Sequence, residues 1–294
     1  MNDNHPVASL PRVAVIGVGT MGTAMAGRLL SSDFQVDVWS RHPASTSHLV
    51  DLGATGYPEV KDAVANADVV LTMLPTAQVT LDVMFEAQGL HAMKRDATWV
   101  QMATVGVGAV ESLAARVMAL RPDVALIDAP VSGSRGPAET GQLLILASGD
   151  ETRASILASV FRVLGRKTMW LGPLGMGSRV KLILNTWLAF QVEGAAEATF
   201  LAHRLGLDPE ILQEALRDSP LASPFALVKL GQMIHDDYHT DFALNLALKD
   251  LDLVGVDAGS DTAPVAAAIA ERWRHLVDSG FGGLDVSAAG RRTP

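Results

Sequence analysis

The sequence predicts an α/β fold in which a doubly wound parallel sheet is followed by an all-helical domain. Up to residue 171, short apolar runs rich in β-branched residues alternate with helical patterns, whereas beyond Gly172 only helical periodicity remains. Strands that alternate with helices are typical of a parallel sheet covered by helices on both faces. We therefore expect one domain over residues 1–172 and a second, all-α domain over residues 173–294.

The first strand and helix of this alternation enclose a glycine motif. A strand pattern over Val13–Ile16 leads into three glycines at the spacing G-x-G-x-x-G, and a helix pattern follows over 21–30. The first glycine of such a turn permits a tight bend, the second lets the backbone approach a pyrophosphate, and the third lets helix pack on strand. The helix N-terminus offers free N–H groups to phosphates. The motif predicts a Rossmann dinucleotide site with contacts from Gly17, Gly19, Thr20, Met21 and Gly22.

The second strand pattern, over 35–39, ends where the two nicotinamide dinucleotides are distinguished. An acidic residue there binds the ribose of NAD, and an arginine accommodates the 2′-phosphate of NADP. This chain has Ser40 and Arg41, while Asp37 is out of phase in the strand alternation and is expected to face away. Because a guanidinium is a permanently charged phosphate ligand, we expect NADP(H) rather than NAD(H). The alternative is that Arg41 is an ordinary solvent-facing arginine.

The remaining elements place further residues at the strand ends. Strands are expected over 68–74, 98–104, 125–129, 142–148 and 167–171, and helices over 43–52, 59–66, 108–120 and 152–164. Ligands of parallel sheets bind beyond the carboxyl ends of the strands, so Leu74, Pro75 and Thr104 should lie along the cofactor crevice, unless Pro75 is only a turn residue. Small residues follow the strand at 125–129, where backbone N–H groups and the Ser132 hydroxyl are suited to holding a substrate carboxylate.

The helical half begins with a long apolar pattern over 178–205 that carries Lys181 and Asn185. Side chains four apart share one helix face. A lysine among apolar residues must snorkel to water or find a partner, and snorkelling is the structural alternative to a functional role. A desolvated ammonium placed over a carbonyl can donate the proton that a hydride transfer requires. Because the helix is apolar on several faces, we expect burial between domains or subunits, hence a homodimer or homotetramer.

Composition excludes several other classes of function. The net charge is −9 and no basic stripe is present, which argues against a nucleic-acid partner. The chain has no cysteine, and the residues around His235 and His239 are expected to form a loop rather than a metal site. No export signal is visible, and the longest apolar stretch, 180–192, is too short to span a membrane. We expect a cytoplasmic protein with no membrane partner.

The chain resembles the β-hydroxyacid dehydrogenase family, relatives of 3-hydroxyisobutyrate dehydrogenase, tartronate semialdehyde reductase and glyoxylate/succinic semialdehyde reductase. Four motifs carry the resemblance: the glycine turn, the segment 128–133 with sequence DAPVSG, the segment 175–185 with sequence GMGSRVKLILN, and the segment 249–251 with sequence KDL. The resemblance implies an NADP-dependent oxidoreductase that acts on a small semialdehyde or keto acid. Its implied site residues are Lys181 as acid/base, Asn185 placing the substrate, Ser132 and Gly133 holding its carboxylate, Lys249 closing over cofactor and substrate, and Thr104 beside the nicotinamide.

Some positions depart from the family pattern. Gln101 and Ala103 replace an acidic residue and a serine before Thr104, and Ser134 replaces a glycine. These changes bear on the substrate rather than on the reaction type. Arg135 is a candidate for a second anionic group of the substrate, with a solvent-facing side chain as the alternative. Two other functions stay open: an imine reductase of the same architecture, against which Lys181 speaks, and a non-catalytic NADP-binding module.

Overall fold

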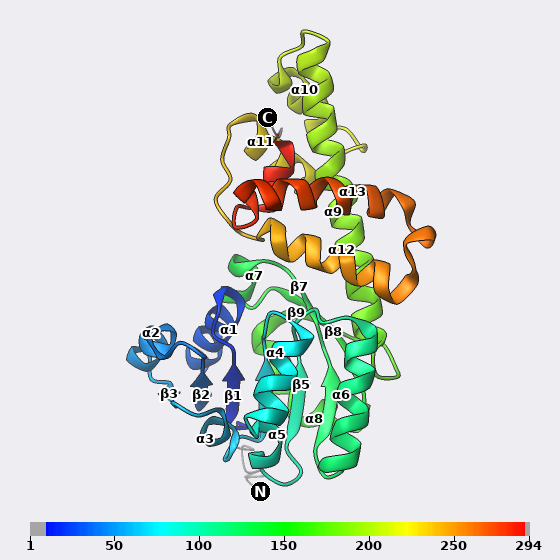
Figure 1. Cartoon of the computed structure of the whole chain (residues 1–294). Helices are drawn as coiled ribbons and strands as arrows, with labels where there is room; N and C mark the ends of the chain where they lie inside the picture. The colour runs from blue at the N-terminus through cyan, green and yellow to red at the C-terminus, as the bar shows by residue number, and fades with distance from the viewer. Residues whose placement is uncertain (1–9, 292–294) are drawn as a thin grey trace, which may run out of the picture. The chain divides into compact units, whose positions relative to one another are not determined.

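The computed structural model describes residues 10–291, and the chain divides into two compact units between Lys181 and Leu182 (Figure 1). The boundary expected from the sequence was at residues 172 and 173. The division falls later because the first residues of the long helix α9 (Met176–Arg204) pack with the sheet of the first unit.

Unit 1 is built on one sheet with the strand order β3-β2-β1-β4-β5-β6-β8-β7, and β9 pairs with β8. The strands are β1 (Val13–Ile16), β2 (Val36–Trp39), β3 (Thr55–Gly56), β4 (Val69–Thr72), β5 (Thr98–Gln101), β6 (Ala125–Asp128), β7 (Val131–Ser132), β8 (Leu143–Gly149) and β9 (Gly165–Trp170). From β3 to β6 all pairings are parallel, as expected. The fold class predicted from the sequence is confirmed.

The far edge of the sheet departs from the parallel pattern, because β8 runs antiparallel to both β6 and β7. A parallel connection needs a crossover that returns the chain to the opposite end of the sheet. Between β6 and β8 the chain forms only β7 and the five-residue helix α7 (Arg135–Glu139), so it turns back directly, and the last residues of β8 pair with the last residues of β6. The full crossover helix α8 (Ala154–Leu164) then makes β9 parallel to β8.

Helices cover both faces of the sheet, and alternate residues of each strand feed two separate cores. Val13 and Val15 pack with α1 (Thr20–Leu30) and α8 on one face, whereas Ala14 and Ile16 pack with the helices of the other face. That second layer contains α3 (Val60–Val64), α5 (Gly89–Ala92) and α6 (Val107–Leu120). The shorter helices α2 (Ser47–Asp51) and α4 (Ala77–Leu81) complete unit 1.

The register of the parallel strands aligns their last residues in a single row. Ile16 is opposite Thr72, Thr72 is opposite Gln101, and Gln101 is opposite Asp128. We call this set the carboxyl-end row. The strands end at this row, so they are shorter than the patterns over 68–74 and 98–104 predicted. Leu74 and Thr104 therefore lie in the turns beyond the strands rather than within them.

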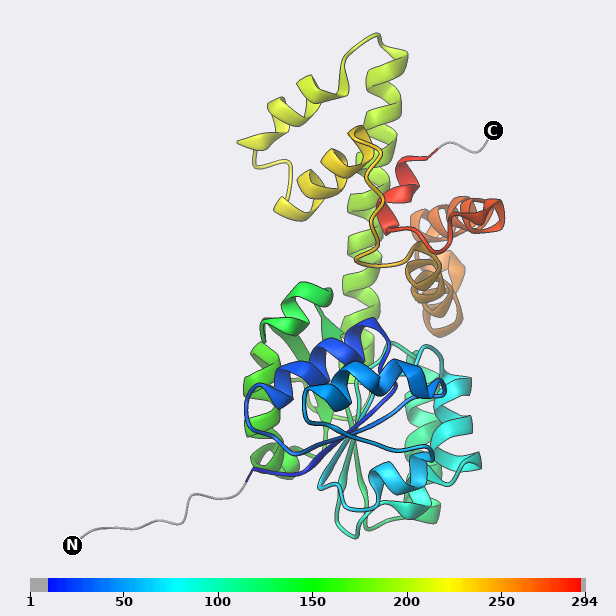
Figure 2. The same ribbon diagram turned by 90° about the vertical axis from the view of Figure 1, so that its left-hand side faces the viewer.

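Over residues 182–291, unit 2 is built of helices and connecting loops, with an isolated bridge between Ala243 and Asp285. Around α9 lie α10 (Pro209–Arg217), α11 (Pro224–Ile234), α12 (Leu244–Ala258) and α13 (Pro264–Leu276). The hairpin of α10 and α11 lies on one side of α9, and α12 and α13 lie on the other (Figure 2). Val192, Leu248 and Trp273 are among the residues of its buried core.

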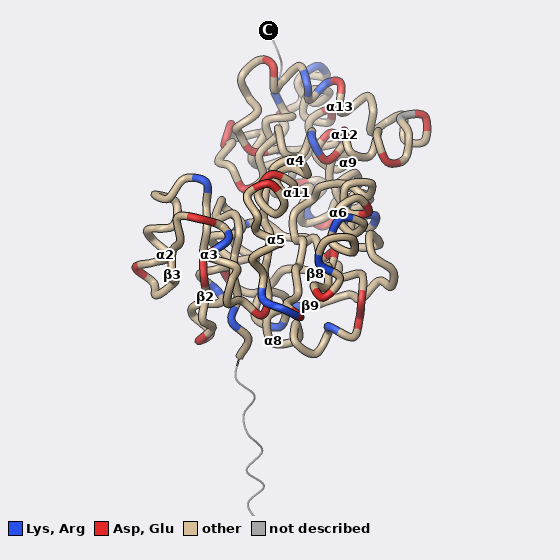
Figure 3. The backbone as a smooth tube through the Cα atoms, turned by 60° about the horizontal axis from the view of Figure 1, so that its bottom comes forward, with Lys and Arg blue, Asp and Glu red and all other residues tan. Residues whose placement is uncertain are grey.

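Charged groups of unit 2 that are buried have partners. The Lys229 ammonium lies 2.7 Å from Asp285 Oδ1, and Glu193 accepts hydrogen bonds of 2.8 Å from Arg272 and from the Trp273 indole. At the level of the whole chain, acidic and basic positions are scattered along the backbone tube (Figure 3). Among the described residues, no helix is both long and apolar enough to cross a membrane.

Candidate active site

The glycine turn between β1 and α1 has two positions that only glycine fits. Gly17 has φ +97°, and a Cβ added there would lie 2.6 Å from the Met73 carbonyl oxygen. A Cβ on Gly22 would lie 2.0 Å from the Gly17 carbonyl oxygen, so the third glycine is what lets α1 start against the end of β1. Both contacts are shorter than real Cβ atoms tolerate, so these glycines serve the fold itself.

Gly19 differs from its two neighbours in the motif. Its φ is −73°, which any residue can adopt, and no heavy atom of the protein lies within 4 Å of the position of an added Cβ. Nothing in the packing of the protein therefore requires glycine here. The approach of another molecule to this backbone is the physical reason that remains, as expected for the middle glycine of a pyrophosphate-binding turn.

The start of α1 is suited to an anion. Gly19 is the N-cap residue, no side chain caps the helix, and its first turn contains no acidic residue. The first N–H groups of a helix have no intrahelical acceptor and carry the positive end of the helix dipole. Thr20 and Met21, the first two helical residues, are exposed and half-buried respectively. The residues present fit the pyrophosphate of a dinucleotide.

The residues after β2 lie where the adenosine end of such a ligand is selected. Ser40 is half-buried and Arg41 is exposed. Asp37 is buried, and both of its carboxylate oxygens accept hydrogen bonds from the Arg12 guanidinium, at 2.6 and 2.7 Å. As the strand alternation predicted, Asp37 is engaged elsewhere and its carboxylate is not presented to a ribose.

The turns beyond β4 and β5 carry the next three predicted residues. Leu74 is buried beneath the glycine turn, where its Cδ2 would be 2.8 Å from a Cβ on Gly17, whereas Pro75 is exposed. Thr104 is half-buried just past the row. Leu74 thus packs against the glycine turn. Pro75 and Thr104 are more exposed to solvent than Leu74.

A hydrogen-bond chain within the row explains the glutamine that departs from the family pattern. The Trp99 indole N–H donates to Thr72 Oγ1 (2.9 Å), and the Thr72 hydroxyl donates to Gln101 Oε1 (2.7 Å). An indole only donates, so Thr72 Oγ1 accepts from Trp99, and the Thr72 hydroxyl hydrogen is directed at Gln101 Oε1. A neutral amide serves as this buried acceptor without the cost of burying a carboxylate.

Ser132 and Gly133 follow β6 in the second predicted segment. Ser132 is half-buried at the end of β7, and Gly133 is exposed with φ +134°. A Cβ on Gly133 would also meet Leu143 Cδ2 at 2.9 Å, so this position requires glycine for its conformation and its packing. Arg135, two residues on, is exposed and pairs with Glu139 at 2.7 Å within α7. This pairing favours the solvent-facing alternative for Arg135.

The first turn of α9 is fastened to the carboxyl-end row. Asp128 accepts hydrogen bonds from the Ser178 N–H and the Ser178 hydroxyl, each of 2.8 Å, and from the Ser148 hydroxyl at 3.1 Å. Ser148 Oγ in turn accepts from the Gly177 N–H at 2.9 Å. Burial raises the pKa of Asp128 above its ordinary value, although the bonds from Ser178 and Ser148 oppose the rise.

Gly177 is required by packing against the sheet, since a Cβ there would lie 2.1 Å from the Leu146 carbonyl oxygen of β8. The close neighbour of this helix start is therefore the sheet of the same unit.

Lys181 and Asn185 lie on consecutive turns of α9. Lys181 is half-buried, and Asn185 is buried and donates a hydrogen bond from Nδ2 to Asp250 Oδ2. The Lys249 ammonium lies 2.7 Å from the other Asp250 oxygen. In unit 2, Asn185 and Lys249 are thus joined through the buried Asp250.

Sequence reasoning did not select Asp128, Ser148, Ser178 or Asp250 as site residues. Asp128 is the first residue of the motif 128–133, and Asp250 follows Lys249 in the motif 249–251, but neither was given a role of its own. The partnership of Asp128 with Ser178 joins positions 50 residues apart, and no local pattern reveals it.

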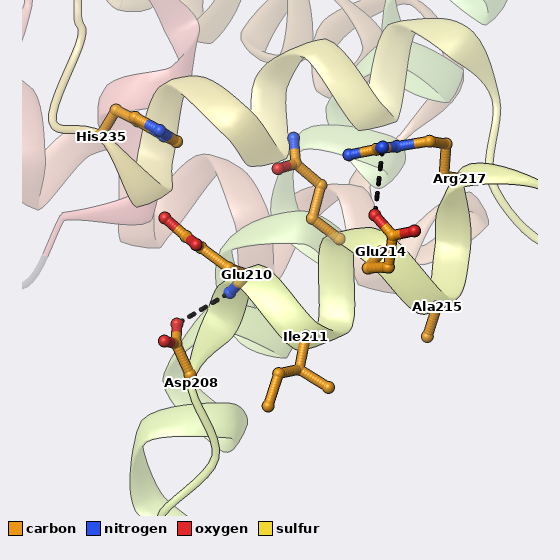
Figure 4. A pocket seen from close by; sticks show the side chains of 8 residues that line it. Asp208, Glu210, Ile211, Glu214, Ala215, Arg217 and His235 are labelled. Atoms are coloured by element: carbon orange, nitrogen blue, oxygen red, sulfur yellow. Dashed lines mark hydrogen bonds and ion pairs between the residues drawn. The ribbon is translucent and has the colours of Figure 1, made fainter.

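A surface depression elsewhere in unit 2 contains none of the predicted site residues. It is lined by residues of α10 and by His235 (Figure 4). Several of its polar groups have local partners: Asp208 caps α10 at the Glu210 N–H, and Arg217 pairs with Glu214. His235 follows α11 in a loop, as expected, and no group of three metal-ligating side chains occurs among residues 10–291.

A doubly wound sheet with this glycine turn defines a dinucleotide-binding protein. Residues 12–172 match the family model described as the NAD binding domain of 6-phosphogluconate dehydrogenase. Residues 175–292 match the one described as NAD-binding of NADP-dependent 3-hydroxyisobutyrate dehydrogenase. The chain belongs to the β-hydroxyacid dehydrogenase family, as its motifs indicated, and is an NAD(P)-dependent oxidoreductase of that type.

Similar proteins cover nearly the whole chain. Glyoxylate/succinic semialdehyde reductase 1 of Arabidopsis thaliana is 32% identical over 94% of this chain and 96% of its own length. The 3-hydroxyisobutyrate dehydrogenase of Mycobacterium tuberculosis, solved with L-serine, is 26% identical with a TM-score of 0.85, over 96% of this chain and 98% of that one. An imine reductase variant of Myxococcus stipitatus, solved with NAD+, is 19% identical with a TM-score of 0.66, over 96% and 98% of the two chains, and shares the fold.

Proposed function

We propose that this protein is an NADPH-dependent reductase of a small semialdehyde or keto acid, and that it oxidises the corresponding 3-hydroxy acid in the reverse direction. The observation that carries the proposal is the carboxyl-end row. It aligns the end of β1, where the glycine turn begins, with the ends of β4 and β5 and with Asp128, which holds the start of α9. Residues that are distant in sequence are thereby gathered at one edge of unit 1.

The strand order supports the direction in which the cofactor lies along this edge. The order reverses between β1 and β4, and dinucleotides bind across such a reversal. With the pyrophosphate at Gly19, the adenosine end lies toward β2 with Ser40 and Arg41. The nicotinamide end then lies toward β4 and β5, with Leu74, Pro75 and Thr104.

Lys181 is the residue we assign to acid/base chemistry. Bound NADPH would supply the hydride. Lys181 donates a proton to the substrate oxygen in the reductive direction and accepts it in the oxidative one. Its place one turn beyond Ser178 supports this role, because Ser178 is bonded to the end of β6. Positioned proton transfer of this kind accounts for about 10²–10⁴-fold in rate.

The substrate is assigned to four other residues. Ser132 offers a hydroxyl and Gly133 an N–H group to the substrate carboxylate. Asn185 donates to Asp250 through Nδ2, and its amide oxygen can accept from a substrate hydroxyl. For Asn185 and Lys249, both in unit 2, the assignment rests on the resemblance to the family and on their shared partner Asp250.

The preference for NADP(H), the oligomer and the compartment remain our proposals. Arg41 is exposed beyond β2 and Asp37 is engaged by Arg12, which supports a 2′-phosphate rather than a free ribose hydroxyl as the ligand there. Exposed apolar residues along α9, among them Ile183, Trp187 and Leu201, and Leu205 directly after it support a homodimer or homotetramer. A cytoplasmic location and the exclusion of nucleic acid as partner rest on composition.

Substitution of Lys181 tests the enzyme against a non-catalytic module. Lys181→Ala should lower kcat by about 10²–10⁴-fold and leave the Kd for NADPH within about twofold, because the cofactor contacts lie elsewhere in the unit. Lys61→Ala, which removes an exposed lysine of α3, is the matched control. Unchanged turnover in the Lys181 variant would refute the assignment.

A substrate screen separates the proposed reductase from an imine reductase. NADPH oxidation is followed with glyoxylate, succinic semialdehyde, tartronate semialdehyde, methylmalonate semialdehyde and a cyclic imine. We expect turnover with a carboxylate-bearing aldehyde. Turnover with the cyclic imine alone would replace the proposal by the imine reductase.

A further inference from the structure

Asp128 is a buried carboxylate with an unusual set of partners. It ends β6, it is fully buried, and it belongs to the carboxyl-end row. Three donors converge on its two oxygens, the Ser178 N–H, the Ser178 hydroxyl and the Ser148 hydroxyl. A buried carboxylate is costly unless donors satisfy it. Since every one of these contacts donates to it, the set is complementary to the ionised form.

These contacts replace a local helix cap. The first N–H groups of a helix need acceptors, and a polar side chain at the N-cap normally supplies one. The residue before α9 is Gly175, which has no side chain and accepts only the Arg179 N–H at its carbonyl oxygen. The Gly177 and Ser178 N–H groups are satisfied instead by Ser148 Oγ and Asp128, which come from strands β8 and β6. The cap of α9 is therefore built into the sheet.

The position of the first turn of α9 is fixed by close packing and by paired hydrogen bonds. A Cβ on Gly177 would lie 2.1 Å from the Leu146 carbonyl oxygen and 3.1 Å from the Asp128 carbonyl oxygen, so the helix backbone packs directly on the strand backbone there. The two oxygens of one carboxylate hold both the N–H and the hydroxyl of Ser178. The packing of Gly177 and the two hydrogen bonds of Ser178 together fix the position of the helix start along its axis and its rotation about that axis.

Lys181 follows Ser178 by one turn and Gly177 by four residues, so it shares their face of the helix. Helical Cα–Cβ bonds tilt toward the N-terminus, so the Lys181 side chain starts back over the turn that Asp128 holds. We propose that Asp128 is the positioning residue of Lys181: by capping α9 from the carboxyl-end row, it sets where the ammonium stands along that edge. This inference rests on the proposed acid/base role of Lys181.

The test uses Asp128→Asn, which keeps the shape of the side chain. One carboxylate oxygen becomes an NH2 group, which has no lone pair to offer the Ser178 N–H or hydroxyl. We expect kcat to fall by about 10- to 100-fold, since a misplacement of about 1 Å can cost 10²-fold. The Kd for NADPH should stay within about threefold. The limb of the kcat–pH profile assigned to Lys181 should move, a change that mere loss of folded enzyme would not cause.

Two further variants keep the test decisive. Asp208→Asn weakens the cap of α10, where Asp208 accepts the Glu210 N–H at 3.0 Å, and serves as the matched capping control with unchanged kcat. Ser178→Ala keeps the backbone bond to Asp128 and removes the hydroxyl bond. It should lower kcat by about 3- to 10-fold, in proportion to one lost bond of about 1 kcal/mol, and it replaces Asp128→Asn if that variant does not fold.

The outcomes separate this inference from the proposed function. All rates are normalised to NADPH-binding sites, and Lys181→Ala is measured in parallel. If Lys181→Ala abolishes turnover while Asp128→Asn and Ser178→Ala keep wild-type kcat and pH profile, the positioning role is refuted and the enzyme assignment stands. If Lys181→Ala retains turnover, the proposed function itself fails, and the positioning role fails with it.

Discussion

Alanine at Gly19 and at Gly22 should separate cofactor binding from folding within a single motif. A Cβ at residue 19 meets no protein atom within 4 Å, and the φ of −73° suits alanine. Replacing glycine at a compatible backbone position stabilises a protein by about 0.4–1 kcal/mol, and the poorer N-cap offsets part of that. The free energy of unfolding of Gly19→Ala should therefore stay within about 1 kcal/mol of wild type.

The same methyl group should interfere with a pyrophosphate. It stands where the ligand must approach the backbone, and the loss of one charge-assisted hydrogen bond costs about 1.5–3 kcal/mol. At 1.4 kcal/mol per tenfold change, the Kd for NADPH should rise by roughly 10- to 150-fold.

Gly22→Ala should behave in the opposite way. Its Cβ would lie 2.0 Å from the Gly17 oxygen, so backbone must move by about 1 Å, and overpacking of this kind costs about 1–3 kcal/mol or more. Urea unfolding gives the stability of each variant, and titration of NADPH fluorescence gives Kd for the folded fraction. A Kd for Gly19→Ala within twofold of wild type, or an unfolding penalty as large as that of Gly22→Ala, would refute the reasoning.

Three other predictions each concern the substitution of one side chain. Arg41→Ala should raise KM for NADPH by about 10- to 100-fold and leave KM for NADH unchanged, because only NADPH carries the 2′-phosphate. Arg95→Ala, at a solvent-facing arginine, is the control. Equal effects of Arg41→Ala on both cofactors would contradict the NADP assignment. Burial alone would raise the pKa of Asp285, but the Lys229 ammonium and backbone N–H groups outweigh it and leave that pKa below its ordinary value. The contribution of Asp285 to stability is therefore complete above about pH 4, its unfolded pKa, and is lost as the pH falls through the lower folded value. Asp285→Asn should cost about 3 kcal/mol of unfolding free energy at pH 7, with a gap to wild type that narrows below pH 4; a gap independent of pH would contradict this. Leu205→Glu, at an 82% exposed position directly after α9, should shift the oligomer to smaller species in sedimentation velocity without lowering Tm, and an unchanged mass would remove this end of α9 from the interface.

The sequence was sufficient for the architecture because the information that specifies it is local. The period of two in the strands, the longer period in the helices and the glycine spacing all lie within windows of a few residues. They predicted the order of the elements, the helical second half, the family and the long helix, which runs over Met176–Arg204 against an expected 178–205. The sequence also predicted that Asp37 faces away from the cofactor site, because side chains alternate between the two faces of a strand.

Only the tertiary structure decided which groups meet. β8 is antiparallel to β6 because only a short segment joins the two strands, and no periodicity in the sequence encodes the direction that this segment takes. The two outer glycines of the turn are required by backbone oxygens that lie close in space, whereas Gly19 is not, a difference that one motif with three identical letters cannot express. The cap of α9 joins Asp128 to Ser178 across 50 residues. Such contacts arise from the register of strands at the sheet edge, which is a property of the folded chain as a whole.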